Sequence, residues 1–187
     1  MLGRRDLDWQ ADLARVGAKR PFLKEQSLWA IWIYRFGRRV DQRPDGIRKR
    51  LLLVLYWFIF RAVETVIGVS IPKSCVVGGG LRIWHFGGIF IHGKAVIGKN
   101  CTIRQGVTIG NRYNDGPAPI LGVNVDLGAY AQVLGAVRIG NGCKIGAMTV
   151  VLVDMPDGST AVGPPARVIL SSLETTAQSA LADQLDS

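Results

Sequence analysis

Hydrophobic residues recur every six positions over most of the chain between residues 71 and 151. Each is Ile, Leu or Val, and many are followed directly by Gly. The positions are Ile71, Val77, Ile83, Ile91, Ile97, Ile103, Ile109, Leu121, Leu127, Val133, Ile139, Ile145 and Val151. A six-residue period is too short for a helical repeat and is typical of a parallel β-helix. Three hexads would form one triangular coil, with the aliphatic side chains stacked inside and Gly relaxing the backbone at the corners.

A second column of small or β-branched residues precedes most of these positions by two. It includes all three cysteines, Cys75, Cys101 and Cys143, so we predict that the thiols are buried as small hydrophobic side chains. Their odd number, the lack of paired spacing and the absence of a signal peptide favour a reducing cytoplasm over disulfides or zinc.

Two interruptions of the period predict loops. Two extra residues fall between Ile83 and Ile91, in the run Trp84-His85-Phe86-Gly87-Gly88, and residues 111–119 replace one hexad. A stacked coil has no room in its wall for extra residues, so these segments should leave it as loops. Loops on a rigid scaffold are where binding and catalytic groups commonly lie.

The first 70 residues have a different pattern, with apolar residues at helical spacing over 6–16 and 28–40. A basic run at 48–50 precedes ten apolar residues, 51–60, which would span ~15 Å of helix, about half of a hydrocarbon core. This is too short for an ordinary transmembrane helix.

Two interpretations of this apolar helix stay open. The helix is buried against the solenoid or at a subunit interface, or it is an interfacial helix whose aromatic and basic residues contact anionic lipid. The aromatic residues concerned are Trp29, Trp32, Tyr56 and Trp57.

Positive charge is concentrated in this same segment. Residues 1–70 carry 14 Lys and Arg against 7 Asp and Glu, whereas the remainder carries 9 against 7. No aromatic and basic nucleic-acid motif accompanies the charge, so we expect an anionic surface or partner and no nucleic acid. The chain should divide into a helical segment over 1–68, a β-helix over 69–170 and a polar tail over 171–187.

Only two histidines are present, His85 and His92, and the β-helix region is poor in acids. No set of ligands has a sensible metal-binding spacing, so no metal is expected. His85 lies in the first predicted loop beside two glycines, where an imidazole can act as a general base near neutral pH. The alternative is a loop histidine that merely caps a coil. His92 follows inward Ile91 and is interpreted as a corner residue.

Residues 71–167 resemble the hexapeptide-repeat acyltransferases and, among them, the serine acetyltransferases. The matching segments are Trp84-His85 with Gly87-Gly88, 95–98, 102–110, 144–147 and the closing Val-Gly-Pro-Pro-Ala-Arg of 162–167. The resemblance implies a mainly β fold, a left-handed parallel β-helix preceded by a small helical segment. It also implies a homotrimer with active sites between subunits, acetyl-CoA as donor and His85 as the catalytic base. Matching family positions imply donor contacts for Gly110, Ala129, Lys144, Ala147 and Arg167.

Departures from the serine-specific pattern argue against free serine. Where those enzymes carry an Asp before the catalytic His, a second Asp that pairs with it and an Arg-His pair, this chain has Trp84, Ser70 and Pro117-Ala118. A zwitterionic amino acid needs charged partners for both ends in a desolvated site. The serine acetyltransferases that dock onto cysteine synthase end in Ile, whereas residues 185–187 are Leu-Asp-Ser, so no such complex is expected.

A subgroup of polysaccharide-biosynthesis enzymes, typified by the colanic acid acetyltransferase, resembles the chain more closely. The shared features are Thr102-Ile103-Arg104, the run 106–112 and a short basic N-terminal segment. We therefore predict transfer of acetyl from acetyl-CoA to a sugar hydroxyl, with a lipid-linked acceptor and contact with the inner face of the membrane as possibilities. L-Serine O-acetylation is the alternative, and a β-helix that serves only as a scaffold is a more distant one.

The predicted mechanism is direct transfer, in which His85 deprotonates the acceptor hydroxyl as its oxygen attacks the thioester. Ser70, or Glu64 from the preceding helix, would orient the imidazole. Lys144 and Arg167 could pair with the nucleotide phosphates of the donor, although Lys144 would equally suit a solvated corner. The candidates for acceptor binding are Trp84, Arg104, Arg112 and Tyr113, because aromatic faces stack on sugar rings and guanidinium groups pair with hydroxyls or carboxylates. Packing against the next subunit is the alternative for Trp84.

Overall fold

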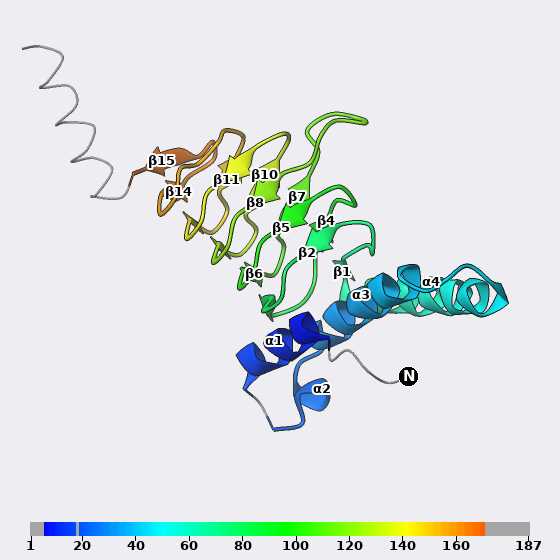
Figure 1. Ribbon diagram of the computed structural model, residues 1–187. Coiled ribbons are helices and arrows are strands. Elements are labelled where there is room, and N and C mark those ends of the chain that lie inside the picture. The colour runs from blue at the N-terminus through cyan, green and yellow to red at the C-terminus, as the bar shows by residue number, and fades with distance from the viewer. Residues whose placement is uncertain (1–5, 18, 171–187) are drawn as a thin grey trace, which may run out of the picture.

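Four helices precede a parallel β-helix in this computed structural model, which describes residues 6–17 and 19–170 (Figure 1). The helices are α1 (Leu7–Val16), α2 (Pro21–Lys24), α3 (Ser27–Asp41) and α4 (Ile47–Ile67). The strands are β1 (Val69–Ser70), β2 (Val76–Val77), β3 (Arg82–Trp84), β4 (Ile89–Ile91), β5 (Val96–Ile97), β6 (Thr102–Arg104), β7 (Thr108–Gly110), β8 (Ile120–Leu121), β9 (Asp126–Leu127), β10 (Gln132–Leu134), β11 (Arg138–Ile139), β12 (Lys144–Ile145), β13 (Val150–Val151), β14 (Thr160–Val162) and β15 (Arg167–Ile169). The predicted fold class, helices followed by a parallel β-helix, is confirmed. The polar tail predicted over 171–187, and with it residues 185–187, lies outside the described residues.

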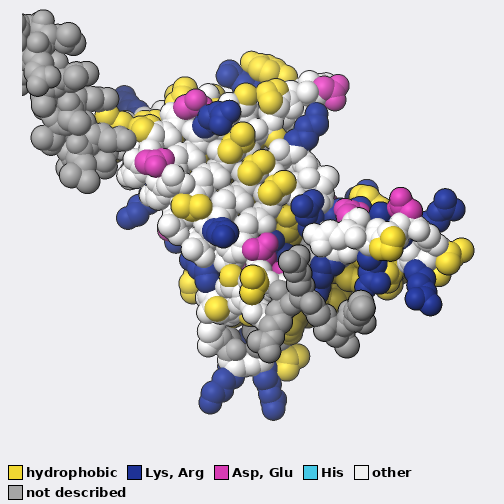
Figure 2. Space-filling view, in the orientation of Figure 1, with side chains coloured by type: hydrophobic (Ala, Val, Ile, Leu, Met, Phe, Trp, Pro, Cys, Tyr) yellow, Lys and Arg dark blue, Asp and Glu magenta, His cyan; other side chains and the backbone are white. Residues whose placement is uncertain are grey.

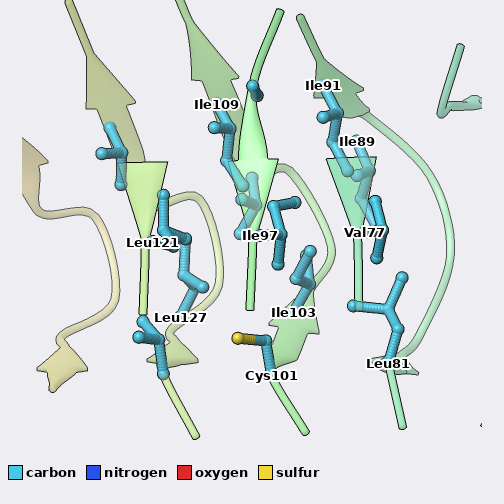
Figure 3. Packing of buried hydrophobic residues seen from close by; sticks show 14 of the residues in the cluster. Val77, Leu81, Ile89, Ile91, Ile97, Cys101, Ile103, Ile109, Leu121 and Leu127 are labelled. Atoms are coloured by element: carbon cyan, nitrogen blue, oxygen red, sulfur yellow. The ribbon is translucent and has the colours of Figure 1, made fainter. Parts of the chain in front are cut away.

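From β1 to β13, strands that are three apart in sequence are neighbours, so the strands form the three sides of a prism. The first sheet has the order β1-β4-β7-β10-β13, the second β11-β8-β5-β2, and the third β15-β14-β12-β9-β6-β3. All named strand pairs are parallel except β14 with β15. The register places hexad positions against each other, for example Ile97 against Val77 and Leu121. Figure 3 shows these side chains stacked inside the prism.

The predicted aliphatic positions form the core of the prism, and all of them are buried. Cys75, Cys101 and Cys143 are free and buried, which confirms their predicted role as small hydrophobic side chains. Burial raises the pKa of the Cys75 thiol to about 12, so this group stays neutral at physiological pH.

The glycines after the aliphatic residues were predicted to relax the backbone at corners, but the structure requires them for a different reason. Gly78 and Gly128 do not have positive φ, so they do not relax the backbone at a turn. A Cβ on Gly78 would lie 2.8 Å from the Lys99 backbone nitrogen, and one on Gly128 would lie 2.5 Å from that of Ala147. Glycine is required at these two positions, which lie at different corners of the prism, because successive coils approach closely there.

Side chains of α3 cover the open backbone edge of the first coil. The Tyr34 hydroxyl accepts a hydrogen bond from the Val77 N–H at 2.9 Å and donates to the Cys75 carbonyl at 3.2 Å. Arg35 donates to the carbonyls of Val77 and Gly78, each at 2.7 Å. An uncovered sheet edge leaves such groups unpaired, so the helices act as a cap on the solenoid.

A buried ion pair connects this cap to α1. The Asp12 carboxylate accepts hydrogen bonds from Arg35 at 2.9 and 3.2 Å and from the Leu81 N–H at 2.8 Å. The side chain of Asp12 is fully buried and that of Arg35 is 5% exposed. Burial raises the pKa of the Asp12 carboxyl, although Arg35 and the Leu81 N–H oppose this shift.

Helices α3 and α4 form an antiparallel pair that projects beyond the side of the β-helix (Figure 1). Tyr56, Phe60 and Ile67 are the buried residues of α4. Much of the apolar run predicted over 51–60 is therefore exposed within one chain. In the described part of the chain, no helix is long and apolar enough to cross a membrane.

Candidate active site

His85 lies in the predicted loop between β3 and β4, at the edge where the third sheet meets the first (Figure 1). Its φ is 59°, in the left-handed region, as are those of Tyr130 and Met148 at later corners of the same edge. The side chain is exposed between exposed Trp84 and Phe86. No described residue of the same chain is hydrogen-bonded to the imidazole, so the ring is free to meet a ligand or a second subunit.

Three further corners continue the edge on which His85 lies. They are residues 105–106, 129–130 and 147–148, each between a strand of the third sheet and a strand of the first. Backbone hydrogen bonds connect these corners, from Gly106 to Gly87 at 2.9 Å, from Tyr130 to Gln105 at 2.8 Å and from Met148 to Ala129 at 2.8 Å. The structure therefore brings three predicted site residues, His85, Ala129 and Ala147, onto one edge of the prism.

Tyr130 on this edge was missed by sequence reasoning. It has φ of 60° and an exposed side chain. A Cβ on Gly106, one coil earlier, would overlap the Tyr130 ring, so the absence of a side chain at Gly106 makes room for it. The available signal was the coil register, which places residue 130 next to residue 106.

The guanidinium group of Arg82 packs against the ring of Trp84. The Arg82 guanidinium lies 4.1 Å from the centroid of the Trp84 ring and forms an ion pair with Glu25 at 3.1 Å. Arg82 is buried, whereas Trp84 is 46% exposed, so part of the ring stays open to a ligand. Sequence reasoning missed both charged residues. Arg82 could have been found, since residues two apart on a strand share a face, but the contact with Glu25 could not.

The structure places Trp84 beside Arg104, its register partner on β6. Arg104 donates to the Asp126 carboxylate and, at 3.2 Å, to the Leu127 carbonyl. Lys144 lies in register with Asp126 on β12 and is exposed. These predicted site residues therefore share the outer face of the third sheet.

Ser70 and Gly110 line a separate shallow groove on the first sheet. Its other lining residues are Phe90, Ile91, His92, Thr108, Ile109, Asn111 and Leu134. His85 is not among them, and the Glu64 carboxylate pairs with Arg61 of its own helix at 2.9 Å. The proposed roles of Ser70 and Glu64 toward His85 thus stay predictions. His92 lies in this groove, where its Nδ1 accepts a hydrogen bond from the Lys94 N–H at 3.2 Å.

Arg112 and Tyr113 lie on the second predicted loop, residues 111–119, which projects between β7 and β8 (Figure 1). They are 5.4 Å apart, guanidinium to ring centroid, and line a hollow with Leu134 and Val153. This loop leaves the edge between the first and second sheets, away from the His85 edge. One chain therefore does not bring these two residues to His85. Arg167 is exposed on β15, at the far end of the third sheet.

The described residues contain no group of three His, Cys, Asp or Glu side chains that could hold a metal ion. The groups on or beside the His85 edge are one imidazole, the three aromatic rings of Trp84, Phe86 and Tyr130, and the backbone of the corners. Such a set can accept a proton and bind a ligand along the edge, which suits transfer of a group to a hydroxyl.

Comparisons with known proteins identify the family. No protein-family model matches the chain. Serine acetyltransferase of Helicobacter pylori is 42% identical over 120 residues, which cover 61% of this chain and 70% of the relative. The structure of Neisseria gonorrhoeae serine acetyltransferase in complex with serine matches with a TM-score of 0.74 and 32% identity, covering 88% of this chain and 68% of that one. A serine acetyltransferase in complex with CoA matches with a TM-score of 0.71 and 30% identity, covering 87% and 66%. With 70% of the Helicobacter pylori enzyme covered at 42% identity and the same fold in the solved structures, this chain belongs to the serine acetyltransferase family.

Proposed function

We propose that this acetyl-CoA-dependent acetyltransferase uses His85 as its general base and L-serine as its acceptor. The relatives support serine, since one solved structure of the family is a complex with serine. They support the alternative predicted from the sequence rather than acetylation of a sugar. The observation that carries the catalytic part is the exposed imidazole on the same edge as residues 129–130 and 147–148.

In the proposed reaction, the His85 imidazole removes the hydroxyl proton of the acceptor as its oxygen attacks the thioester carbonyl. The new C–O bond gives a tetrahedral oxyanion, which backbone N–H groups of the glycine-rich loop or a neighbouring coil stabilise. Collapse of this intermediate breaks the C–S bond, and the imidazolium returns its proton to the leaving CoA thiolate. A positioned base of this kind typically contributes ~10²–10⁴-fold in rate.

The donor is proposed to lie along the His85 edge, with Ala129 and Ala147 near the pantetheine arm and Lys144 and Arg167 near the phosphates. Gly110 lies in the separate groove of the first sheet and would contact the donor only from a second chain. The complex of a related enzyme with CoA supports a CoA site in this fold. Because Arg112 and Tyr113 leave a different edge of the prism, they would reach His85 only from a second chain. This geometry supports sites between subunits, as in the homotrimer that the family resemblance implies.

One observation favours a sugar hydroxyl as a second candidate acceptor. Trp84 directly precedes His85, and its ring is supported by Arg82 while remaining partly open. An aromatic ring in this position suits stacking on a sugar ring better than binding a charged amino acid. Arg104, its neighbour in the register, already pairs with Asp126.

The test is release of CoA thiol from acetyl-CoA with L-serine or with a panel of sugars. We expect serine-dependent release, and a loss of ~10²–10⁴-fold in His85→Gln with unchanged CoA binding. His92→Gln is the matched comparison and should lose far less, because its ring contacts the Lys94 backbone. Release with sugars alone would favour the second acceptor, and full activity in His85→Gln would refute the proposed base.

A further inference from the structure

An apolar stripe runs along the outer face of α4. It consists of Ile47, Leu51, Val54, Leu55 and Phe58, which follow helical spacing and are 47–77% exposed. The opposite face of the same helix packs on α3 through Tyr56 and Phe60. Helix α4 is therefore apolar on two faces, of which only one is covered. A helix of this kind normally has its second face covered by another apolar phase or partner.

The apolar surface extends around the helix toward α2. An open hollow is lined by Phe22, Trp29, Trp32, Ile59 and Val63. Trp57 of α4 is also nearly half exposed. Tryptophan is enriched where protein meets the polar boundary of a bilayer, because its ring is apolar and its N–H is polar.

Basic side chains flank the outer stripe. At ~100° per residue, Arg48 lies on one side of the stripe, and Arg50 and Arg61 lie on the other. The end of the α3–α4 pair, residues 38–50, carries six Lys and Arg against two Asp. Arg43, Arg48 and Arg50 are exposed, and no carboxylate of the described residues lies within salt-bridge distance of them. Figure 2 shows Lys and Arg side chains in dark blue along the projecting pair, next to hydrophobic side chains.

We propose that the α3–α4 pair docks on an anionic phospholipid surface, with α4 lying in the plane of the interface. An apolar stripe between basic flanks is the pattern of an interfacial helix, in which the stripe enters the acyl boundary and the cations meet lipid phosphates. The charges favour this occupant over a symmetric pair of stripes from two chains, because two such stripes face to face would bring like charges together. Contact of the stripe with a different face of a neighbouring subunit is an outcome of the test below. The inference does not depend on the acceptor.

The experiment is flotation of the full-length protein with vesicles of phosphatidylcholine, or of an equal mixture of phosphatidylcholine and phosphatidylglycerol. We expect binding to the anionic vesicles, weakened by added salt and nearly absent on phosphatidylcholine alone. Arg48→Gln/Arg50→Gln should lower the partition coefficient by about fivefold for each Arg removed. Lys94→Gln/Arg138→Gln makes the same change in charge at exposed sites of the β-helix and should have little effect.

Phe58→Gln tests the apolar part and should also lower vesicle binding, whereas Ile169→Gln, at an exposed site on β15, should not. Both positions are exposed, so folding should be kept, which circular dichroism verifies. The proposal is overturned if the protein does not bind anionic vesicles, or if the variants on α4 bind vesicles as strongly as the control variants on the β-helix. It is also overturned if Phe58→Gln instead dissociates an oligomer in sedimentation, because a second copy would then cover the stripe.

Discussion

The guanidinium of Arg82 lies 4.1 Å from the centroid of the Trp84 ring, one residue before the imidazole proposed as the catalytic base. Arg82 itself is fixed by Glu25, which belongs to the segment between α2 and α3. The helical segment thus supports, through Arg82, the Trp84 ring that directly precedes His85. A region that looks like a separate appendage in the sequence contributes directly to the candidate site.

Glu25→Gln should destabilise the fold and weaken acceptor binding. The substitution leaves the Arg82 guanidinium, which is 3% exposed, without its counter-charge. Because Glu25 is partly exposed, we expect about 1–3 kcal/mol of lost stability in urea unfolding. Asp45→Asn, which removes an exposed ion pair with Lys49, is the control and should not change the midpoint. A rise in KM with little change in kcat would show that the ion pair supports Trp84, and wild-type KM and stability would contradict this role.

Asp12→Asn should be the more damaging of the two carboxylate changes. Asp12 is fully buried, and its loss of charge leaves Arg35 with only a longer, 3.6 Å contact to the half-exposed carboxylate of Asp8. Breaking one side of a buried pair costs ~3–5 kcal/mol, measured by chemical denaturation. The double variant Asp12→Asn/Arg35→Met should be more stable than additivity predicts, since it removes the stranded charge. Additive losses would show that the pair is not coupled.

Gly78→Ala should destabilise the solenoid although its φ is compatible with alanine. The new Cβ would lie 2.8 Å from the Lys99 backbone nitrogen, and main chain cannot move aside as a side chain can. Overpacking of this kind costs ~1–3 kcal/mol in thermal or urea unfolding. Gly110→Ala is the matched comparison, because its nearest neighbours would be 3.8 Å away, and it should be close to neutral. Equal effects of the two substitutions would refute the close-approach explanation.

Stability should fall in alkali as a result of Cys75. Its pKa is raised from 9.0 to about 12 in the folded protein. Between these values the unfolded chain loses the thiol proton while the folded chain keeps it, so unfolding becomes more favourable as pH rises from about 9 to about 12. Unfolding free energies measured across this range should decline more steeply in the wild type than in Cys75→Ala. Parallel curves would show that the thiol does not titrate in this way.

The repetitive part of the molecule could be predicted because the position of a residue within its hexad determines whether its side chain is buried. Ile97 is buried for the same local reason as Ile103, so period, core and loop positions follow from spacing alone. Residues that act across long separations could not be found this way, since nothing in the sequence near Asp12 indicates Arg35 or Leu81. The glycine corners were predicted for the wrong reason, because close approach between coils becomes visible only when the coils are stacked.

The candidate site likewise contains residues that the sequence could predict and residues that only the stacked coils reveal. His85 could be located from the interruption of the period and the resemblance, whereas Tyr130 required the register between coils. The preference for a sugar acceptor rested on Trp84, Ser70 and Pro117-Ala118 in place of serine-site residues, and on the resemblance of residues 102–112 and the basic N-terminal segment to polysaccharide enzymes. The relatives favour serine instead. What Trp84 and Ser70 contribute will be decided by the acceptor assay.

A stack of identical coils has no intrinsic reason to stop growing, since each coil is a template for the next. Tyr34, Arg35 and Asp12 occupy the hydrogen-bonding groups that an added coil would need. The helical segment therefore caps the first coil and protects the protein against end-to-end association into fibres. Removing the helical segment would expose the hydrogen-bonding groups of the first coil, to which another coil could add.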